Sequence, residues 1–537
     1  MLTSLLLAAT VATASPAAAD IHRILADRID SQRLSVGIVV GIVDPSGRRV
    51  VSHGTLDTTS KRPVNGDTLF EIGSATKVFT SLLLADAVAR GEVALTDPVS
   101  KYLPETVKMP ARGGKQITLQ DLATHTSGLP RLPMNFAPKD PANPYADYTD
   151  AMLYEFLSGY ELARDIGSQY EYSNLGAGLL GHVLARRAGM TYEQLVEKRI
   201  TGPLAMKSTF IAIPAKEKAR LAAGHDGELN PAANWDLTTL AGAGALRSST
   251  NDLLTFLAAN LGLEKSPLAA PMTGMLAARR PAGAAGEIAL GWHVAKSPAG
   301  NEVIWHNGGT GGYRSFMGFD PKKRLGVVVL SNVSTPAGVD DIGRHLLDPS
   351  ALLAKSRTQV AVAAEVLEKY VGTYELVPSF RITVTRDGGR LFAQATGQPK
   401  FEIFPESETK FFYKVVPAQI TFGEKSLTLH QNGRDMPARR IEGEVPPPKE
   451  RKAITLPAET LERYVGRYQL APQFIITITR DGERLFLQAT GQPRLEMFAE
   501  AEKEFFLKVV DAQVTFGDGQ LVLHQNGMDQ VAKKMEK

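Results

Sequence analysis

The stretch Glu71-Ile72-Gly73-Ser74-Ala75-Thr76-Lys77 leads directly into an apolar run, Val78-Phe79-Thr80-Ser81-Leu82-Leu83-Leu84-Ala85. The run predicts a helix that begins near Ser74, with Lys77 one turn further along. Residues at positions i and i+3 share a helix face, so the lysine amine is expected beside the serine hydroxyl. A buried lysine of lowered pKa can accept the serine proton, and the positive helix end favours the negative charge that develops. Alone, however, this spacing fits a capped helix with a surface lysine more often than a catalytic pair.

A second motif, Tyr172-Ser173-Asn174, precedes the apolar run 175–180 and is expected on a turn before a helix. A tyrosine aimed at Ser74 and Lys77 could relay a proton to a leaving group, if nearby cations or strong hydrogen bonds lowered its pKa from near 10. An asparagine amide could orient Lys77 and bind a substrate carbonyl. Taken alone, the motif also fits a turn with a buried aromatic residue.

A third motif, Ile304-Trp305-His306-Asn307-Gly308-Gly309, is followed by Thr310-Gly311-Gly312 and by an apolar strand at 315–319. Glycines at a strand edge allow a substrate backbone to approach closely. A backbone N–H from this segment and that of Ser74 could form an oxyanion hole. His306 by itself also fits a strand histidine with satisfied hydrogen bonds.

The order and spacing of the three motifs resemble those of the serine β-lactamase and penicillin-binding-protein superfamily. Residues from about 30 to 345 are most similar to its class C-like serine hydrolases, which include D-peptidases and carboxylesterases. Three long stretches support the resemblance: Leu95-Thr96-Asp97-Pro98-Val99, Ile117-Thr118-Leu119-Gln120-Asp121-Leu122-Ala123-Thr124-His125-Thr126-Ser127-Gly128-Leu129-Pro130 and Gly244-Ala245-Leu246-Arg247-Ser248-Ser249-Thr250. The resemblance implies an α+β fold, in which an antiparallel sheet with helices on its faces adjoins an all-helical lobe and the site lies between them. The strand pair in Gly318–Asn332 is expected at the edge of that sheet.

The resemblance also implies roles for individual residues. Ser74 is the nucleophile that becomes acylated, Lys77 activates it, and Tyr172 exchanges protons with Ser74 and the leaving group. Four residues are expected to bind substrate: Asn174, which would also position Lys77, His306, Gly308 and Gly309. Gly309 is expected to supply the second oxyanion N–H. The segment His125, Ser127 and Gly128 is expected to shape a turn beside the site.

Two features depart from the lactamase pattern. His306 stands where the lactamases have a lysine, and imidazole attracts a β-lactam carboxylate less than an ammonium group does. The second motif has no Ser-Asp-Asn, so a mechanism with a separate glutamate base is not supported. Whether Lys77 or Tyr172 is the main base stays open.

The last third of the chain contains a tandem duplication. Residues 367–436 match residues 461–530, 94 positions further on, at 45 of 70 positions without gaps. Each copy alternates apolar and polar residues around an Asp-Gly pair, Asp387-Gly388 and Asp481-Gly482, which predicts antiparallel hairpins. About eight strands per copy suit a small lipocalin-like barrel, whose interior is more often filled by side chains than open to a ligand. The equivalent His430 and His524 are expected to be hairpin-end residues, with a paired metal site as the weaker alternative.

Composition sets the remaining limits. The 537 residues carry 60 basic and 57 acidic side chains, and no cysteine, which excludes thiol chemistry and disulfides. The histidine and glycine spacings predict no metal site and no cofactor, and the charge balance predicts no nucleic-acid partner. Residues 1–19 resemble a secretory signal without the basic start, so an exported, periplasmic or secreted protein with no membrane span is expected. The predicted division is a signal peptide at 1–19, a hydrolase domain at 20–350, and barrels at 360–445 and 455–537, with a linker at Gly443–Lys452.

These observations favour an exported serine hydrolase that opens amide bonds of short peptides, plausibly with D- or non-standard residues. A linearised cyclic peptide such as microcystin is one specific possibility for the substrate. A β-lactamase or a small-acyl carboxylesterase is the alternative within the same chemistry. A penicillin-binding or cell-wall-binding protein without turnover is the alternative from another class. The sequence does not indicate the oligomeric state.

Overall fold

The computed structural model describes residues 16–283, 286–336, 338–354, 359–377, 380–396, 398, 400–413, 418–431, 434–441, 453–471, 474–489, 495–507, 512–525 and 528–535. The chain divides into two units, Met1–Ser356 and Arg357–Lys537. Residues 1–15 of the predicted signal segment lie outside the described residues, and so does the whole predicted linker, Gly443–Lys452.

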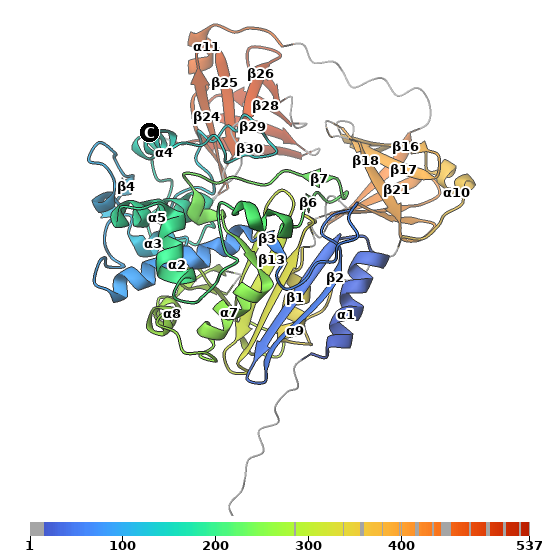
Figure 1. Cartoon of the computed structure of the whole chain (residues 1–537). Coiled ribbons are helices and arrows are strands. Elements are labelled where there is room, and N and C mark those ends of the chain that lie inside the picture. The colour runs from blue at the N-terminus through green and yellow to red at the C-terminus, as the bar shows by residue number, and fades with distance from the viewer. Residues whose placement is uncertain are drawn as a thin grey trace, which may run out of the picture. The chain divides into compact units, whose positions relative to one another are not determined.

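The first unit is built on an eight-stranded antiparallel sheet (Figure 1). Its strands lie side by side in the order β2 (Gly47–Gly54), β1 (Gly37–Asp44), β14 (Leu325–Ser331), β13 (Arg314–Asp320), β12 (Glu302–Gly309), β11 (His293–Lys296), β10 (Glu287–Ile288) and β9 (Arg280–Pro281). Three short strand pairs stand outside it: β3 (Leu69–Glu71) with β8 (Arg247–Ser249), β4 (Ala111–Arg112) with β5 (Lys115–Gln116), and β6 (Gly224–His225) with β7 (Pro231–Ala232).

The predicted sheet with helices on both faces and a helical lobe is confirmed. The helices are α1 (Ala18–Ala26), α2 (Thr76–Ala89), α3 (Leu119–Ala123), α4 (Asp150–Gly159), α5 (Asn174–Ala188), α6 (Tyr192–Val196), α7 (Thr250–Asn260), α8 (Ala269–Ala277) and α9 (Asp340–Leu347). Short 3-10 or π turns lie at η1 (Asp27–Ser31), η2 (Gly73–Ala75), η3 (Val99–Tyr102), η4 (Glu197–Thr201), η5 (Ala215–Arg220) and η6 (Ala241–Ala243). In Figure 1, α2, α3, α4 and α5 gather to one side of the sheet and form the lobe.

The sheet is covered on both faces because β1 alternates its side chains between two cores. Ile38, Val40 and Ile42 pack in a cluster with apolar residues of α1 and α9. Val39 and Val43 belong to the larger core, which includes residues of α7 and of the helical lobe. A strand buried on both faces reads as a continuous apolar run, and β1 is buried along its whole length.

The expected place of the Gly318–Asn332 strand pair was wrong. The pair contributes to β13 and β14, which lie in the interior of the sheet, between β12 and β1. The apolar run of β14 is buried at every position, as a central strand requires. The edge strands are β2, which carries the exposed Arg48 and the half-buried Arg49, and the two-residue β9.

The second unit contains two closed eight-stranded antiparallel barrels, as the sequence predicts. The first consists of β15 (Gly372–Val377), β16 (Phe380–Asp387), β17 (Arg390–Ala395), β18 (Phe401–Pro405), β19 (Lys410–Phe412), β20 (Ala418–Phe422), β21 (Ser426–Gln431) and β22 (Arg434–Ile441), after α10 (Ala364–Lys369). The second consists of β23 (Gly466–Ala471), β24 (Phe474–Asp481), β25 (Arg484–Ala489), β26 (Leu495–Ala499), β27 (Glu504–Leu507), β28 (Ala512–Gly517), β29 (Gln520–Gln525) and β30 (Met528–Lys534), after α11 (Ala458–Glu462).

Side chains fill the barrel interiors. In the first barrel Tyr370 stacks on Phe422 at 4.2 Å between ring centroids, and the Tyr374 hydroxyl donates to the Tyr370 carbonyl at 3.0 Å. The equivalent residues of the second barrel repeat both contacts. His430 lies on β21 with its ring nitrogens 2.7 Å from Asp435 Oδ1 and 2.9 Å from Thr421 Oγ1. His524 has the same two kinds of partner, Asp529 and Thr515, so the duplicated histidines join neighbouring strands.

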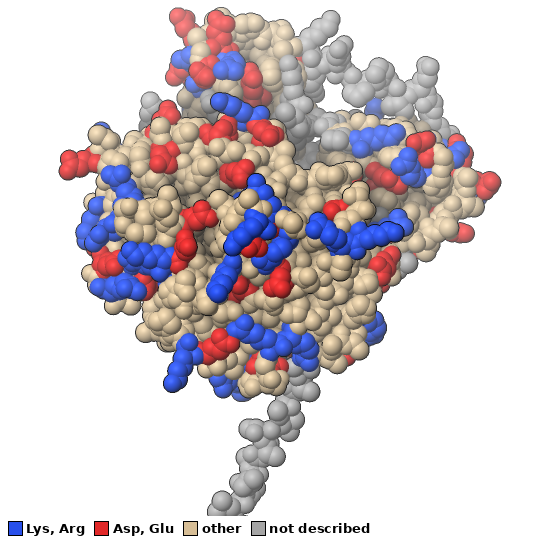
Figure 2. Space-filling view, in the orientation of Figure 1, with Lys and Arg blue, Asp and Glu red and all other residues tan. Residues whose placement is uncertain are grey.

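Basic and acidic side chains are interspersed on the face drawn in Figure 2, in keeping with the small net charge of +3. Among the described residues, none of the helices combines the length and the apolar character needed to cross a membrane.

The helix packing predicts opposite effects for two helical glycines. A Cβ on Gly343 of α9 would collide with the Phe316 ring, whereas a Cβ on the exposed Gly274 of α8 would meet no atom within 4 Å. We expect Gly343→Ala to lower the free energy of unfolding by about 1–3 kcal/mol through overpacking. Gly274→Ala should raise it by about 0.5–1 kcal/mol through helix propensity.

Urea unfolding followed by tryptophan fluorescence tests both changes in the intact protein, because all three tryptophans, Trp235, Trp292 and Trp305, lie in the first unit. Equal effects of the two substitutions would contradict the packing described for α9.

Candidate active site

The Ser74 loop is fixed between the sheet and the helical lobe. Strand β3 leads through the turn η2 into α2, so Ser74 lies two residues before the first residue of the helix. Gly73 has φ +51°, and a Cβ there would lie 2.7 Å from the Gly309 nitrogen. Only glycine accepts this conformation and this contact together, so the loop can lie directly against β12.

The Lys77 amine lies between two oxygen atoms. Its Nζ is 2.8 Å from Ser74 Oγ and donates to the Ala243 carbonyl of η6 at 2.7 Å. Lys77 is 1% exposed, and burial holds its pKa well below 10.5, with the nearby Arg131 lowering it further. A neutral amine beside a hydroxyl is suited to accept its proton.

The predicted neighbour Tyr172 lies against this pair. Its ring centroid is 4.8 Å from Lys77 Nζ and 5.2 Å from Arg131 Cζ. Burial raises the pKa of Tyr172 above its usual value of 10, and interaction with the Ser74 hydroxyl and with Arg131 only partly opposes the rise. The Arg131 charge therefore does not bring the pKa of the phenol into the neutral range, and Tyr172 is protonated at neutral pH.

The turn expected at His125–Gly128 supports the Tyr172 loop. His125, which has φ 55°, packs its ring 4.6 Å from that of Tyr172, and its Nδ1 accepts the Ser173 N–H at 3.1 Å. Ser173 caps α5 by accepting the Gly176 N–H, and its hydroxyl donates to the Pro130 carbonyl. Burial holds the pKa of His125 well below 6.5, so the ring is neutral and its Nδ1 is free to accept.

No hydrogen bond joins Asn174 to Lys77 among the described residues. Its Nδ2 donates to the Tyr145 hydroxyl at 3.0 Å, and its buried Oδ1 has no hydrogen-bond partner among the described residues. The place next to the Lys77 amine is taken by the Ala243 carbonyl, which comes from a separate loop. The Asn174 carboxamide oxygen is thus left as an acceptor at the N-terminus of α5.

The β12 motif borders Ser74 on the other side. A Cβ on Gly308 would collide with the Ile72 carbonyl and lie 2.9 Å from the Ser74 nitrogen, so the strand touches the loop only because the side chain is missing. His306 is fully buried, and its Nδ1 donates to the Asn307 carbonyl at 2.6 Å. Burial and the neighbouring His293 hold the pKa of His306 well below 6.5, so this strand offers no positive charge at neutral pH.

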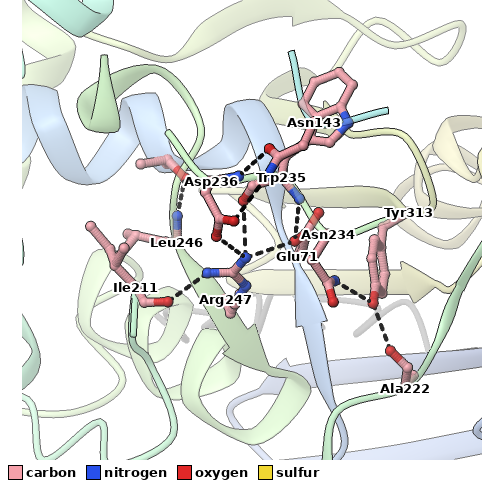
Figure 3. Close-up of polar contacts among 11 residues, drawn as sticks. Glu71, Asn143, Ile211, Ala222, Asn234, Trp235, Asp236, Leu246, Arg247 and Tyr313 are labelled. Carbon is pink, nitrogen blue, oxygen red and sulfur yellow. Dashed lines mark hydrogen bonds and ion pairs between the residues drawn. The ribbon is translucent and has the colours of Figure 1, made fainter. Parts of the chain in front are cut away.

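A buried ion pair behind the Ser74 loop was not predicted. Arg247 donates to Glu71 Oε1 at 3.0 Å, and both side chains are less than a tenth exposed (Figure 3). The Trp235 N–H donates to the same carboxylate oxygen at 3.0 Å, and Arg247 also donates to the Ile211 and Trp235 carbonyls. Burial raises the pKa of Glu71 and the Arg247 charge opposes the rise. The network ties β3, which leads into Ser74, to β8 and to the loop of Trp235.

Both partners of this pair lie in stretches that the motifs single out, but no sequence pattern predicts that they meet. Glu71 opens the first motif and Arg247 lies within the stretch 244–250, but 176 positions separate them along the chain. The only local sign of an ion pair is that each charged residue stands among mostly apolar or small neighbours in the sequence. Tyr145 and Arg131, which also lie beside the second motif, gave no signal in the sequence.

Comparison with known proteins agrees with this geometry. The Beta-lactamase family model matches residues 22–350, and a model named Domain of unknown function (DUF3471) matches residues 356–433 and 450–523. A beta-lactamase of Pseudomonas fluorescens is 30% identical over 360 residues, which cover 59% of this chain and 95% of the relative. The D-alanyl-D-alanine-carboxypeptidase/endopeptidase AmpH of Escherichia coli K12 is 32% identical over 329 residues, covering 58% and 83%. The crystal structure of a beta-lactamase/D-alanine carboxypeptidase from Yersinia pestis, complexed with citrate, superposes with a TM-score of 0.55 at 27% identity, covering 63% of this chain and 99% of that one.

The fold and these relatives define the protein as a serine hydrolase that acts through an acyl-enzyme. The chain belongs to the beta-lactamase family. The resemblance drawn from the three motifs is therefore confirmed.

The buried ion pair predicts an asymmetric response to substitution. Arg247→Ala should lower the free energy of unfolding by about 3–5 kcal/mol, because it leaves Glu71 buried without a counter-charge. Glu71→Gln combined with Arg247→Met should recover part of the loss. As a control, Arg48→Ala breaks a pair with Glu264 whose side chains are 34% and 52% exposed, and should cost less than about 1 kcal/mol. Urea unfolding measures all three, and equal costs for the two arginines would contradict the assignment.

The buried histidines predict acid sensitivity. Burial lowers the pKa of His293 from 6.5 to about 4, and those of His125 and His306 are also lowered. The unfolded chain then binds protons below pH 6.5 that the folded chain does not, so the free energy of unfolding falls as pH drops from 6.5 toward 4. Each histidine contributes up to about 1.4 kcal/mol per pH unit.

The slope of unfolding free energy against pH over this range measures the effect. His293→Gln removes about one proton from the difference in proton binding between the unfolded and folded chains. The slope should therefore become shallower by up to about 1.4 kcal/mol per pH unit, whatever the effect of the substitution on stability at pH 7. A slope that is the same in the variant and the parent would show that His293 is not buried as a neutral ring.

Proposed function

We propose that this protein is an exported peptidase that opens amide bonds of short peptides, including peptides with D- or non-standard residues, through an acyl-enzyme on Ser74. The observation that carries the proposal is the 2.8 Å contact between Ser74 Oγ and a buried Lys77 amine of lowered pKa. A named carboxypeptidase/endopeptidase among the relatives supports peptide chemistry. The apolar N-terminal segment of residues 1–19 supports export.

In this mechanism Lys77 is the base and Tyr172 is the acid. Neutral Lys77 takes the proton of Ser74 Oγ as that oxygen attacks the substrate carbonyl carbon. Tyr172, whose raised pKa keeps it protonated, donates its proton to the leaving nitrogen and is reprotonated from Lys77. Water then attacks the acyl carbon, and the same groups return the proton to Ser74. The opposite directions of the two pKa shifts favour this assignment over a tyrosinate base.

The oxyanion that forms on the carbonyl carbon needs two N–H donors. The backbone N–H groups of Ser74 and Gly309 suit this role, because the Gly73–Ser74 loop lies directly against Gly308 and Gly309. Asn174, His306 and Gly308 complete the proposed substrate contacts. The unpartnered Oδ1 of Asn174 can accept a substrate N–H, and the missing side chain of Gly308 keeps the strand edge open.

The neutral His306 favours a peptide over a β-lactam within this family. A β-lactam brings a carboxylate, and a buried neutral ring on β12 gives that group no charge to bind. The relatives include proteins named beta-lactamase, so β-lactam hydrolysis is the second candidate, and small-acyl ester hydrolysis uses the same groups. Comparative kcat/KM on a D-aminoacyl anilide, a chromogenic cephalosporin and a short-chain nitrophenyl ester ranks the three activities.

Substitutions at the three motif residues should separate their roles. Ser74→Ala should abolish the mass increase of an acyl adduct, Lys77→Ala should lower kcat/KM by about a thousandfold or more, and Tyr172→Phe by about 10²–10⁴-fold. The matched control is Tyr170→Phe, which removes the hydroxyl of a neighbouring tyrosine and should stay within a few-fold of the parent. Intact-mass spectrometry and steady-state rates are the measurements.

The pH profile tests the direction of proton transfer. Because only neutral Lys77 can act as the base, kcat/KM should rise with pH through a Lys77 pKa well below 10.5 and then level off. Hydrolysis by Ser74→Ala at the parent rate would overturn the proposal, and a profile with no acid limb would remove Lys77 as the base.

A further inference from the structure

Arg131 places an exposed positive charge beside Tyr172 of the proposed site. It directly follows the segment His125–Pro130, and its carbonyl accepts the N–H groups of Asn174 and Leu175 at 3.0 and 3.1 Å. These bonds fix its backbone to the first turn of α5. Its guanidinium carbon then lies 5.2 Å from the centroid of the Tyr172 ring, on the α5 side of Ser74.

No carboxylate neutralises this charge among the described residues. Arg131 forms no ion pair there, and its guanidinium lies over the face of the Tyr172 ring. The charges that shift the pKa values of Lys77, His125, Tyr172 and His306 come from Arg131, Lys77, histidines or tyrosines, and none comes from Asp or Glu. Two acids in or beside the motifs have other partners: Glu171 pairs with Arg164, and Glu71 pairs with Arg247.

Three other basic side chains near the site, Lys77, Arg247 and Arg314, are held by contacts within the protein. Lys77 is buried against Ser74 and Ala243, and Arg247 is paired with Glu71. Arg314, beside Gly309, donates to the carbonyls of Thr310, Tyr313 and Thr335. Arg131 differs from all three because its side chain is exposed and makes no hydrogen bond to a carbonyl or a carboxylate within the described part of the chain. The N-termini of α2 and α5 add to the positive potential there.

We propose that Arg131 is a specificity residue that binds a carboxylate of the substrate, so that the enzyme prefers acidic peptides. This inference rests on the proposed function, because it concerns the same site. The guanidinium presents a planar fork of donors that matches a carboxylate, and it lies on the α5 side, where Asn174 Oδ1 is also unpartnered. The carboxylate can belong to the acyl part of the substrate or to its leaving group, and the charge on Arg131 would attract either.

Two matched substrate pairs separate these positions. The acyl pair is the p-nitroanilides of D-glutamate and D-glutamine, which differ by one charge at nearly constant size. The leaving-group pair is the D-alanine anilides of 5-amino-2-nitrobenzoic acid and of its carboxamide. In the intact parent protein we expect kcat/KM to favour the acidic member of one pair by about 10- to 100-fold, the range of a charge-assisted hydrogen bond.

Arg131→Gln should reduce that preference to within about twofold of unity, and Arg131→Lys should keep part of it. The matched control is Arg187→Gln, which removes an exposed charge from the other end of α5, about 20 Å along the helix, and should leave the preference unchanged. Rates are compared at pH values on the plateau, because Arg131 lowers the pKa of Lys77 and its loss shifts the acid limb upward. Added salt should weaken the preference, since the arginine is exposed.

A second measurement does not depend on turnover. The dissociation constants of 3-carboxyphenylboronic acid and 3-carbamoylphenylboronic acid, which form a bond from boron to a serine oxygen, are compared by calorimetry. The parent should bind the carboxylate form more tightly, and Arg131→Gln should bind the two alike.

The outcomes distinguish the two proposals. Three results overturn the role of Arg131 and leave the Ser74 chemistry standing. They are hydrolysis without a charge preference in either pair, a charge preference that survives Arg131→Gln, and a loss of kcat/KM in Arg131→Gln that is equal for both members of a pair. The equal loss would mean that Arg131 acts through Tyr172. Full activity in Ser74→Ala overturns the proposed function. The charge preference of that activity is still measurable, so the two proposals are tested separately. Absence of both hydrolysis and boronate binding overturns both.

Discussion

The buried Lys77 amine, held between the Ser74 hydroxyl and the Ala243 carbonyl, is the interaction on which the arrangement of the first unit depends. A desolvated amine keeps a low pKa only if every element around it excludes water. Helix α2 supplies the amine, η6 supplies the carbonyl, and the loop before α5 covers the pair with the Tyr172 ring. Helix α2, the turn η6 and the loop before α5 thereby meet around one polar contact.

Two further constraints keep that contact in place. The glycines of β12 let the strand lie against the Ser74 loop, because a Cβ at Gly308 would collide with the Ile72 carbonyl. The buried pair of Glu71 and Arg247 anchors the strand that enters the loop. Since a buried ion pair is costly to desolvate, its value here lies in fixing β3 relative to β8, not in adding net stability. The site that results carries positive charge from Arg131, whereas the buried His306 on β12 is neutral.

The barrels of the second unit follow from simpler rules. Alternating residues and turn pairs were enough to predict eight strands for each copy, because a hairpin is a local structure whose register its own turn sets. The interior aromatic residues repeat in both copies, and so do the contacts of His430 and His524. Long-range placement was harder to predict. The pair β13 and β14 was expected at the sheet edge and lies in its interior, since strand order depends on which distant segments close around it.

The sequence by itself determined the nucleophile motif, the helix that carries Lys77, the α+β class and the duplicated barrels, because each of these depends on spacing within a short segment. Tertiary structure alone decided which groups surround the motif. It gave Lys77 the Ala243 carbonyl where Asn174 was expected, and it made His306 neutral by burying it. It also set Glu71 against Arg247 and left Arg131 facing Tyr172, with no carboxylate partner in the described part of the chain. Burial and charge pairing depend on segments far apart along the chain, so no local pattern encodes them.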